Sequence, residues 1–445
     1  MDGIRIIRDA SYAVMCLCGK QKYDYTLQYR LSDFVFRCKI GGSSLYYSCL
    51  TGELVEVTKQ EMAFQYLVKH WFYVEKGLNE KENAPKLRKL LYALEKREKP
   101  GYNRFEILTT TKCNANCCYC YEHGFKQMSM SKDTALKVVH YIKNNLWGAE
   151  ANIRWYGGEP LMNTKAIDWI SEGLANQGIA FSSKMISNGY LFSENIILKA
   201  SKLWNLKNVR ITLDGVENTH NTIKHFKNVS QSPFLRILNN VELLLNAGIS
   251  VTIRINVENH NIDEIKEVVD LICARFGKTK LIDFMFRPLS NTNKLATIES
   301  DDETRRKIYN RINEIKTYLF ENGVGVNSRE LIGLTPYSCS ADDRRYLLIK
   351  PNGELAFCPE DFDIKQHGSI DKSEQCLRPL SYYEYRYDKG DICNDCPLYI
   401  CCYPNNMCPA SKKTVCNEFQ KDSILKDLEL SIKKEYRHYK KVNKI

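Results

Sequence analysis

The sequence predicts an α/β protein built around an incomplete, TIM-like barrel of six strand–helix units, (β/α)6, with a smaller N-terminal element and a cysteine-rich C-terminal part. Three observations predict this fold class. Between residues 99 and 330, apolar runs alternate six times with amphipathic stretches, the pattern of parallel strands joined by right-handed crossovers. Polar and glycine-rich motifs follow several of these runs, where barrels carry their chemistry. Cysteines crowd the last third of the chain.

Composition sets the first limits. A chain of 445 residues suits two or three domains, and its net charge of +11 favours anionic partners of any kind. The charged stretch Met1–Arg8 is unlike a secretory signal, and the apolar run Tyr12–Cys18 is too short to cross a bilayer. We therefore expect a cytoplasmic protein that binds neither membrane nor nucleic acid, and we interpret its 18 cysteines mainly as metal-binding thiols.

Residues 1–98 form the predicted N-terminal element. Two β-rich runs, Ser32–Ile40 and Ser43–Val57, are separated by a glycine pair that predicts a hairpin turn. Helices are expected at Gln60–Val74 and Ala84–Arg97. Strands followed by helices are similar to the winged-helix-like leader-binding elements of peptide-modifying enzymes, which add a peptide as a strand to a sheet edge. The alternative is a structural cap without a partner.

The middle region, residues 99–330, carries the predicted barrel. A final helix from about Asp302 to Glu321 shows one apolar face. Six strands are expected at Phe105–Thr109, Asn152–Tyr156, Phe181–Ser187, Asn208–Leu213, Ser250–Val257 and Lys280–Phe286.

Three thiols follow the first barrel strand at the spacing CxxxCxxC: Cys113, Cys117 and Cys120. Three thiolates hold three irons of a [4Fe–4S] cube and leave the fourth iron open. A zinc site or buried thiols are the alternatives, although zinc loops usually carry CxxC pairs. With an aromatic residue at Tyr119, the loop resembles the cluster loop of radical S-adenosylmethionine (SAM) enzymes. The resemblance implies that SAM chelates the open iron and that Tyr119 contacts the cofactor.

Two turns after later strands extend this resemblance. The motif after the second strand reads Gly-Gly-Glu-Pro and is similar to the family segment that receives the SAM amino group. Its residues are Gly157, Gly158, Glu159 and Pro160. The turn Ser187-Asn188-Gly189 resembles the family's T/S-N-G turn after the third strand. The resemblance implies that both turns bind the cofactor; a plain strand-to-helix turn is the alternative for the first.

The fourth strand ends in Ile-Thr-Leu-Asp-Gly, which resembles the family's I-S-I-D-G. This implies that Thr212 contacts SAM and that Asp214 lies near the substrate as the candidate catalytic residue, with a structural Asp-Gly turn as the alternative. His220 and Lys224 follow at the spacing of a family H-D-x-x-R segment, with lysine in place of arginine. Arg254 and Arg287, at the ends of the fifth and sixth strands, are expected at the same mouth of the barrel, where they could bind carboxylates. Arg254 is expected to bind cofactor, and a structural ion pair is the alternative for each arginine.

In the C-terminal region, residues 331–425, Cys339 is followed by thirteen residues, Gly353, four residues and Cys358, and a CxxC-x5-C run begins at Cys393. This spacing resembles that of the SPASM domain, which holds two auxiliary [4Fe–4S] clusters. The chain ends in a basic helix at 426–445. The spacing before Cys408 departs from the family pattern, and Cys401 competes with Cys402, which the spacing favours. A zinc ribbon is the alternative. The implied ligands are Cys339, Cys358 and Cys408 for a first cluster, and Cys393, Cys396, Cys402 and Cys416 for a second.

Together these resemblances imply a radical SAM peptide maturase with three [4Fe–4S] clusters and SAM as cofactors. They imply a ribosomally made precursor peptide with a leader as substrate, a thioether or other crosslink as product, and flavodoxin or ferredoxin as electron donor. An anaerobic sulfatase-maturing enzyme that forms formylglycine is the alternative, and a non-enzymatic electron carrier or zinc scaffold is a third. The first auxiliary cluster is expected to have an open iron for a substrate thiolate, unless Cys376, Cys401, an N-terminal cysteine or Glu360 completes it.

Overall fold

The computed structural model describes most of the chain. The described residues are 3–95, 101–289, 301–328, 330–331, 333–335, 340–341, 343–359, 368–372, 391–402 and 416–444. The chain divides into two compact units, each with its own core. The smaller unit combines residues 1–99, 328–339 and 380–445, and the larger unit combines residues 100–327 and 340–379.

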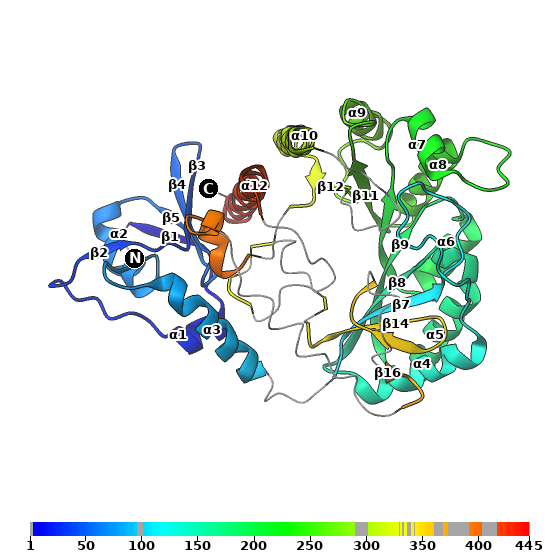
Figure 1. Ribbon diagram of the computed structural model, residues 1–445, viewed down its shortest axis with the longest axis horizontal. Helices are drawn as coiled ribbons and strands as arrows, with labels where there is room; N and C mark the ends of the chain where they lie inside the picture. The colour runs from blue at the N-terminus through cyan, green and yellow to red at the C-terminus, as the bar shows by residue number, and fades with distance from the viewer. Residues whose placement is uncertain are drawn as a thin grey trace. The chain divides into compact units, whose positions relative to one another are not determined.

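The larger unit is built on one long sheet. Its central strands run parallel to their neighbours, and helices lie along one side of the sheet (Figure 1). All six strands predicted for the barrel are confirmed, with small shifts at their ends. They are β7 (Arg104–Thr110), β8 (Glu150–Gly157), β9 (Ala180–Ser187), β10 (Leu206–Thr212), β11 (Ser250–Val257) and β12 (Ile282–Pro288).

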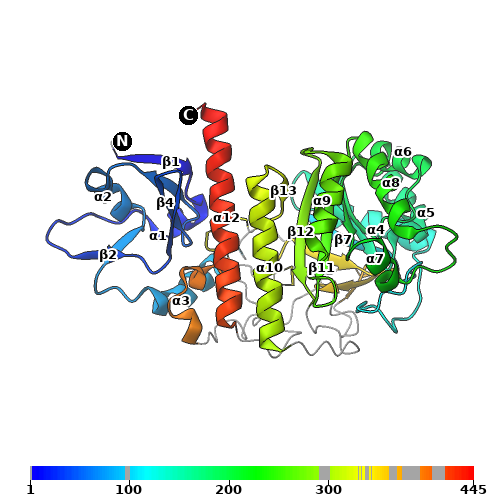
Figure 2. The ribbon, with the colours of Figure 1, turned by 90° about the horizontal axis from the view of Figure 1, so that it is seen from above.

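The helices of this unit cover the apolar face of the sheet. In β8 the buried residues Ala151, Ile153 and Trp155 alternate with more accessible ones, so one face meets helices and the other is polar. Figure 2 shows α10 beside β12, toward one edge of the sheet. The sequence predicts a helix over the same residues as α10. The helices are α4 (Lys132–Asn145), α5 (Thr164–Asn176), α6 (Glu194–Lys202), α7 (Glu217–Lys224), α8 (Pro233–Asn246), α9 (Ile265–Phe276) and α10 (Asp302–Glu321).

Additional strands extend the sheet at both edges. β13 (Gly325–Val326) pairs with β12, and β14 (Tyr346–Ile349) runs parallel to β7 on the other side. β15 (Glu354–Ala356) and β16 (Gly368–Ser369) continue beyond β14 as antiparallel strands. Part of the cysteine-rich region therefore belongs to the same sheet as the predicted barrel.

The smaller unit contains an antiparallel four-stranded sheet in the order β1-β5-β4-β3. The predicted hairpin joins β3 and β4 through Gly41 and Gly42, whose φ angles of +52° and +85° favour glycine. The strands are β1 (Ile4–Arg8), β3 (Val35–Ile40), β4 (Ser43–Ser48) and β5 (Leu54–Val57). Three helices accompany them: α1 (Tyr12–Cys18), α2 (Gln60–Lys69) and α3 (Glu80–Glu95).

One predicted helix of this unit was too long. The helix expected at Gln60–Val74 ends at Lys69, and Tyr73–Glu75 form strand β6 instead. β6 pairs with β2 (Tyr29–Leu31), so hydrogen bonds to a distant segment replace the last helical turn. The sequence periodicity carries no information on such a partner.

The C-terminal helix α12 (Glu418–Asn443) belongs to the smaller unit. It begins with a capping box, in which Asn417 and Gln420 each accept from the other's backbone N–H. Its apolar face packs into a core that includes Leu45, Leu54 and Leu398. The Tyr436 hydroxyl also lies 2.8 Å from both Ser43 Oγ and a carboxylate oxygen of Glu56. The helix thus packs onto the N-terminal sheet.

Candidate active site

The loop with the first three cysteines follows β7 and is held against the end of α7. The backbone N–H of Asn116 donates to the carbonyl oxygen of Lys224 at 3.0 Å, and that of Lys227 donates to Asn114 at 2.9 Å. The N–H of Cys118 reaches Ile223 O at 3.3 Å. These bonds fix the path of the loop through its backbone.

The thiols of Cys113, Cys117 and Cys120 are close enough to influence one another. Burial, with smaller contributions from the neighbouring Glu159, Cys117 and Cys120, raises the pKa of Cys113 to about 12. Cys118, between them, is exposed. Three thiols grouped on one loop are a donor set for an iron–sulfur cluster with one iron left open, so these residues fit the cluster that the motif implies.

The Gly-Gly-Glu-Pro turn packs directly on the backbone of this loop. A Cβ atom at Gly157 would lie 2.1 Å from Thr110 O, and one at Gly158 would lie 2.4 Å from Lys112 O. The N–H of Glu159 donates to Lys112 O at 2.9 Å. Only glycines allow this approach, so the turn after β8 is fitted to the loop after β7. Pro160 then begins the short 3-10 helix η1 (Pro160–Asn163).

The Glu159 carboxylate links the turns after β8 and β9. It is fully buried and accepts hydrogen bonds from Ser187 Oγ at 2.9 Å and from the N–H of Asn188 at 2.8 Å. Burial raises the pKa of Glu159 to about 7. The Asn188 amide in turn donates to Asn114 Oδ1 at 2.7 Å on the cysteine loop. Three predicted cofactor residues therefore form one connected frame around the loop.

Asp214 lies in a buried ion pair behind the loop. Its carboxylate is 2.8 Å from Lys224 Nζ, accepts from the N–H of Asn256 at 3.0 Å and also accepts from the Tyr119 hydroxyl. Burial alone would raise the pKa of Asp214, but Lys224 and the Tyr119 hydrogen bond hold it below its ordinary value. Asp214 is only 1% exposed, and its three donors account for its charge without a substrate.

The remaining predicted residues of this region lie around the same strand ends. His220 is buried beside Asp214, where its Nδ1 accepts from the Asp214 N–H at 3.3 Å, and burial lowers the pKa of His220 to about 3. Thr212 and Arg254 are directly opposite each other on β10 and β11. Arg254 Nε donates to Asn256 Oδ1 at 2.8 Å. The strand ends thus gather the predicted cofactor residues in one unit.

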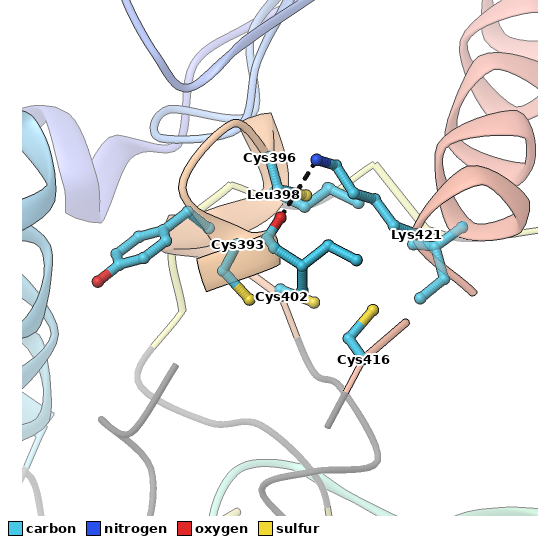
Figure 3. A pocket seen from close by; sticks show the side chains of 9 residues that line it. Cys393, Cys396, Leu398, Cys402, Cys416 and Lys421 are labelled. Carbon is cyan, nitrogen blue, oxygen red and sulfur yellow. Dashed lines mark hydrogen bonds between the residues drawn. The ribbon is translucent and has the colours of Figure 1, made fainter. Parts of the chain in front are cut away.

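A second cysteine group lines a pocket in the smaller unit (Figure 3). Two short 3-10 helices, η4 (Asp391–Cys393) and η5 (Pro397–Ile400), shape its wall together with the start of α12. Lys421 Nζ closes one side by donating to Ile392 O at 3.2 Å. The cysteines that line the pocket are Cys393, Cys396, Cys402 and Cys416.

The two adjacent cysteines of this segment differ in position. Cys401 is 1% exposed and packed in the apolar core, whereas Cys402 lines the pocket with the other thiols. Cys358 follows β15 in the larger unit, while Cys339 and Cys408 lie outside the described residues. Within the described residues, no three histidine, cysteine or acidic side chains converge to hold a single metal ion.

Comparison with known proteins identifies the larger unit. Residues 107–272 match the radical SAM superfamily. This chain carries a radical SAM domain. The domain spans the strands from β7 to β11 and contains the cysteine loop, the Gly-Gly-Glu-Pro turn and Asp214.

Several curated proteins share sequence with the chain. An uncharacterized protein of Methanocaldococcus jannaschii is 26% identical over 283 residues, which cover 63% of this chain and 92% of that protein. The sporulation killing factor maturation protein SkfB of Bacillus subtilis is 27% identical over 179 residues, 40% of each chain. The similarity to SkfB thus covers less than half of either protein.

Solved structures share the fold of this chain. The anSMEcpe protein with bound AdoMet has a TM-score of 0.58 at 16% identity, covering 76% of this chain and 99% of that one. Streptococcus suis SuiB bound to its precursor peptide SuiA has a TM-score of 0.53 at 14% identity, covering 84% and 95%. In the described part of this chain, no helix is long and apolar enough to cross a membrane.

Sequence reasoning missed two features of the site. The first is the role of Lys224, whose ammonium group neutralises Asp214 and also contacts the Tyr119 hydroxyl. Its spacing from Asp214 was visible, but the pairing depends on the helix that follows β10. The second is the set of basic residues along the polar face of the sheet. Only Arg254 and Arg287 were noticed, because only they follow the expected strand-end pattern.

Proposed function

We propose that this chain is a radical SAM peptide maturase that crosslinks a ribosomally made precursor peptide through a thioether. One observation carries the proposal: three grouped thiols on a loop that the Gly-Gly-Glu-Pro turn contacts at backbone distance. Cys113, Cys117 and Cys120 would hold the cluster. When bound, the cluster and SAM supply reductive cleavage to methionine and a 5′-deoxyadenosyl radical, which abstracts hydrogen from a C–H bond.

The residues around the loop would hold the cofactor in position. Gly157 and Gly158 let the turn pack against the backbone of the loop, while the buried Glu159 carboxylate accepts a hydrogen bond from Ser187 in the next turn. Thr212 and Arg254, side by side at the strand ends, would contact SAM. Because its carboxylate is buried and fully paired, Asp214 would act as a positioning residue that holds Tyr119 and the loop.

The relatives support a peptide as substrate. SkfB is named as a maturation protein, and SuiB was solved with a precursor peptide. The small sheet of the N-terminal unit ends in β1 and β3, and strands of this kind can accept an added peptide strand. We propose that this unit binds the leader, as a winged-helix-like element would, and that flavodoxin or ferredoxin supplies the electron.

The second cysteine group supports an auxiliary cluster of the SPASM kind. Cys393, Cys396, Cys402 and Cys416 are four thiols around one pocket, the number that a closed [4Fe–4S] cube needs. We assign Cys402 rather than Cys401 as the ligand, because Cys401 lies in the apolar core. Cys358, together with Cys339 and Cys408, would hold a further cluster whose open iron accepts the substrate thiolate.

The test is a reaction under anaerobic conditions with SAM, a reductant and any short cysteine-containing peptide that a gene neighbouring this one encodes. We expect a peptide product lighter by two hydrogen atoms, resistant to thiol alkylation at one cysteine. Conversion of cysteine or serine to formylglycine would instead support the sulfatase-maturing alternative. Production of 5′-deoxyadenosine without change in any such peptide would contradict the peptide substrate while leaving the radical SAM chemistry intact.

A further inference from the structure

The polar face of the larger sheet carries basic side chains on neighbouring strands. Arg154 on β8 lies directly opposite Lys184 on β9, and on this face β10 carries Arg210, two residues before Thr212. Directly opposite residues on paired strands share a face, and so do residues two apart on one strand. Arg254 is opposite Thr212, and Arg287 is opposite Asn256, so the same face continues to β12. Five cations thus share one side of the sheet.

The acids among these cations are too few to balance them within the described residues. Glu106 pairs with Arg154 at 3.1 Å, and Asp283 accepts from the neutral Thr252 hydroxyl at 2.7 Å. Glu122 also acts electrostatically on Tyr156 of this face. Among the described residues, this face thus carries five cations and three carboxylates.

Arg210 shows the consequence most directly. Its Nε is buried without a hydrogen-bond partner in the part of the chain that the structure describes. Burial, together with Arg154, Arg254 and Arg287, lowers the pKa of Arg210 to about 10. A buried guanidinium N–H without an acceptor is costly, so an acceptor that arrives with a ligand would be favoured.

We infer that this face, defined by Arg154, Lys184, Arg210, Arg254 and Arg287, binds the carboxylate of an acidic side chain in the substrate peptide. This rests on the proposed function, because it names a feature of the same substrate. Guanidinium groups hold carboxylates through two parallel hydrogen bonds, which fixes position as well as charge. The enzyme would thereby select peptides with Asp or Glu near the residue that reacts.

The carboxylate of SAM does not account for all of these cations. SAM would lie at the strand ends, beside Gly157 and Thr212. Arg154 and Arg210 come three and two residues earlier on their strands, about 10 Å and about 7 Å below those ends at 3.3 Å per residue. Arg254 is close enough to serve the cofactor, whereas the deeper arginines are left for the substrate.

The inference is tested by calorimetric titration of the reconstituted, SAM-loaded enzyme with two capped tripeptides, acetyl-Gly-Asp-Gly-amide and acetyl-Gly-Asn-Gly-amide. They differ only in the charge of one side chain. We expect the Asp peptide to bind about tenfold more tightly, since one charge-assisted hydrogen-bonded pair is involved. The R210Q variant should reduce this preference to less than twofold.

Two further variants keep the test decisive. Because R154Q alone would leave Glu106 buried without its cation, the E106Q/R154Q double variant removes both charges and should also lower the preference. The R305Q/R306Q variant on α10 removes two positive charges away from this face and should keep the preference for the Asp peptide. Equal affinity of the wild type for both tripeptides, or an unchanged preference in R210Q, would overturn the inference.

A third probe separates carboxylate from phosphate recognition. The probe is inorganic pyrophosphate, titrated into the wild type and into R210Q. The carboxylate assignment would be overturned if pyrophosphate bound the wild type more tightly than the Asp peptide does and bound R210Q more weakly than the wild type. Formation of 5′-deoxyadenosine by the wild type and by R305Q/R306Q is measured in parallel. If cleavage of SAM is absent, the proposed function fails whatever the tripeptides do; if cleavage is present and the tripeptides bind equally, only the present inference fails.

Discussion

The two cysteine segments of this protein are held in place by different forces. The loop with Cys113 is fixed by backbone hydrogen bonds, by the Glu159 carboxylate and by the buried Asp214–Lys224 pair. The segment with Cys402 is fixed by apolar packing, in which Leu398 and Ile400 enter the core of the smaller unit. Tyr399 also stacks on Phe34 of the N-terminal sheet, with ring centroids 6.3 Å apart.

This difference indicates what each site depends on. Polar bonds with fixed directions place the first loop relative to the strand ends, so its geometry is set locally by the sheet of the larger unit. The second segment depends on a core formed with residues far away in sequence, including those of β3, β4 and α12. A change in the N-terminal sheet should therefore affect the second site and spare the first.

The largest effect is expected from breaking the buried ion pair. Lys224→Met would leave Asp214 charged and unpaired, at a cost of about 3–5 kcal/mol. We expect loss of iron from the first site and loss of SAM cleavage, measured by iron analysis and by 5′-deoxyadenosine formation. Lys224→Arg should retain most activity, and D214N/K224M should recover stability relative to K224M. K266M, which removes the exposed Lys266–Asp270 pair, should leave both the iron content and SAM cleavage nearly unchanged.

The dependence of the second cysteine segment on apolar packing is tested at Phe34, which is 2% exposed in the core of the smaller unit. Phe34→Ala should cost about 3–5 kcal/mol through the cavity that it leaves. We expect iron loss from the second site while SAM cleavage persists. The matched variant Phe284→Ala, in the core of the larger unit, should lower SAM cleavage and keep the iron of the second site. Loss of SAM cleavage in F34A with full iron content would contradict the independence of the two sites.

How much of the fold and of the site could be predicted from the sequence depended on how far apart in the sequence the contacting residues lie. The strands β7–β12 were predicted, because short apolar runs and helical periodicity are local signals. β1 was missed and the helix before β6 was predicted too long, since both strands depend on partners 42 to 53 residues away, such as Val57 for Ile4. The cysteine loop, the glycine turn and Asp214 were found by motif, whereas the pairing of Lys224 needed the fold.

A smaller effect is expected from replacing one of the adjacent residues Cys401 and Cys402, and it concerns the iron content of the second site. Cys402→Ala should remove about four irons per chain, those of one cube, because Cys402 faces the pocket. Cys401→Ala should keep the iron and lower the stability only by the loss of a small apolar group. Iron analysis and electron paramagnetic resonance of the reduced proteins distinguish the two. The opposite pattern would assign Cys401 as the ligand.

The smallest effect concerns the contact of α12 with the N-terminal sheet. Tyr436→Phe removes the hydrogen bonds to Ser43 and Glu56 and should cost about 1–3 kcal/mol, since one partner is a carboxylate. We expect a lower Tm for the smaller unit and no change in SAM cleavage. Tyr439→Phe on the same helix serves as the control. Equal Tm values for the two variants would show that these hydrogen bonds contribute nothing net.

The central claim is that the loop of Cys113, Cys117 and Cys120 binds the cluster that cleaves SAM. Its most direct test is 5′-deoxyadenosine formation by the anaerobic, reduced protein and by the C113A/C117A/C120A variant. We expect the wild type to form 5′-deoxyadenosine, and the triple variant to form none while keeping its circular dichroism spectrum. C118A, which changes the exposed neighbouring thiol, should retain cleavage. Undiminished cleavage by the triple variant would contradict the claim.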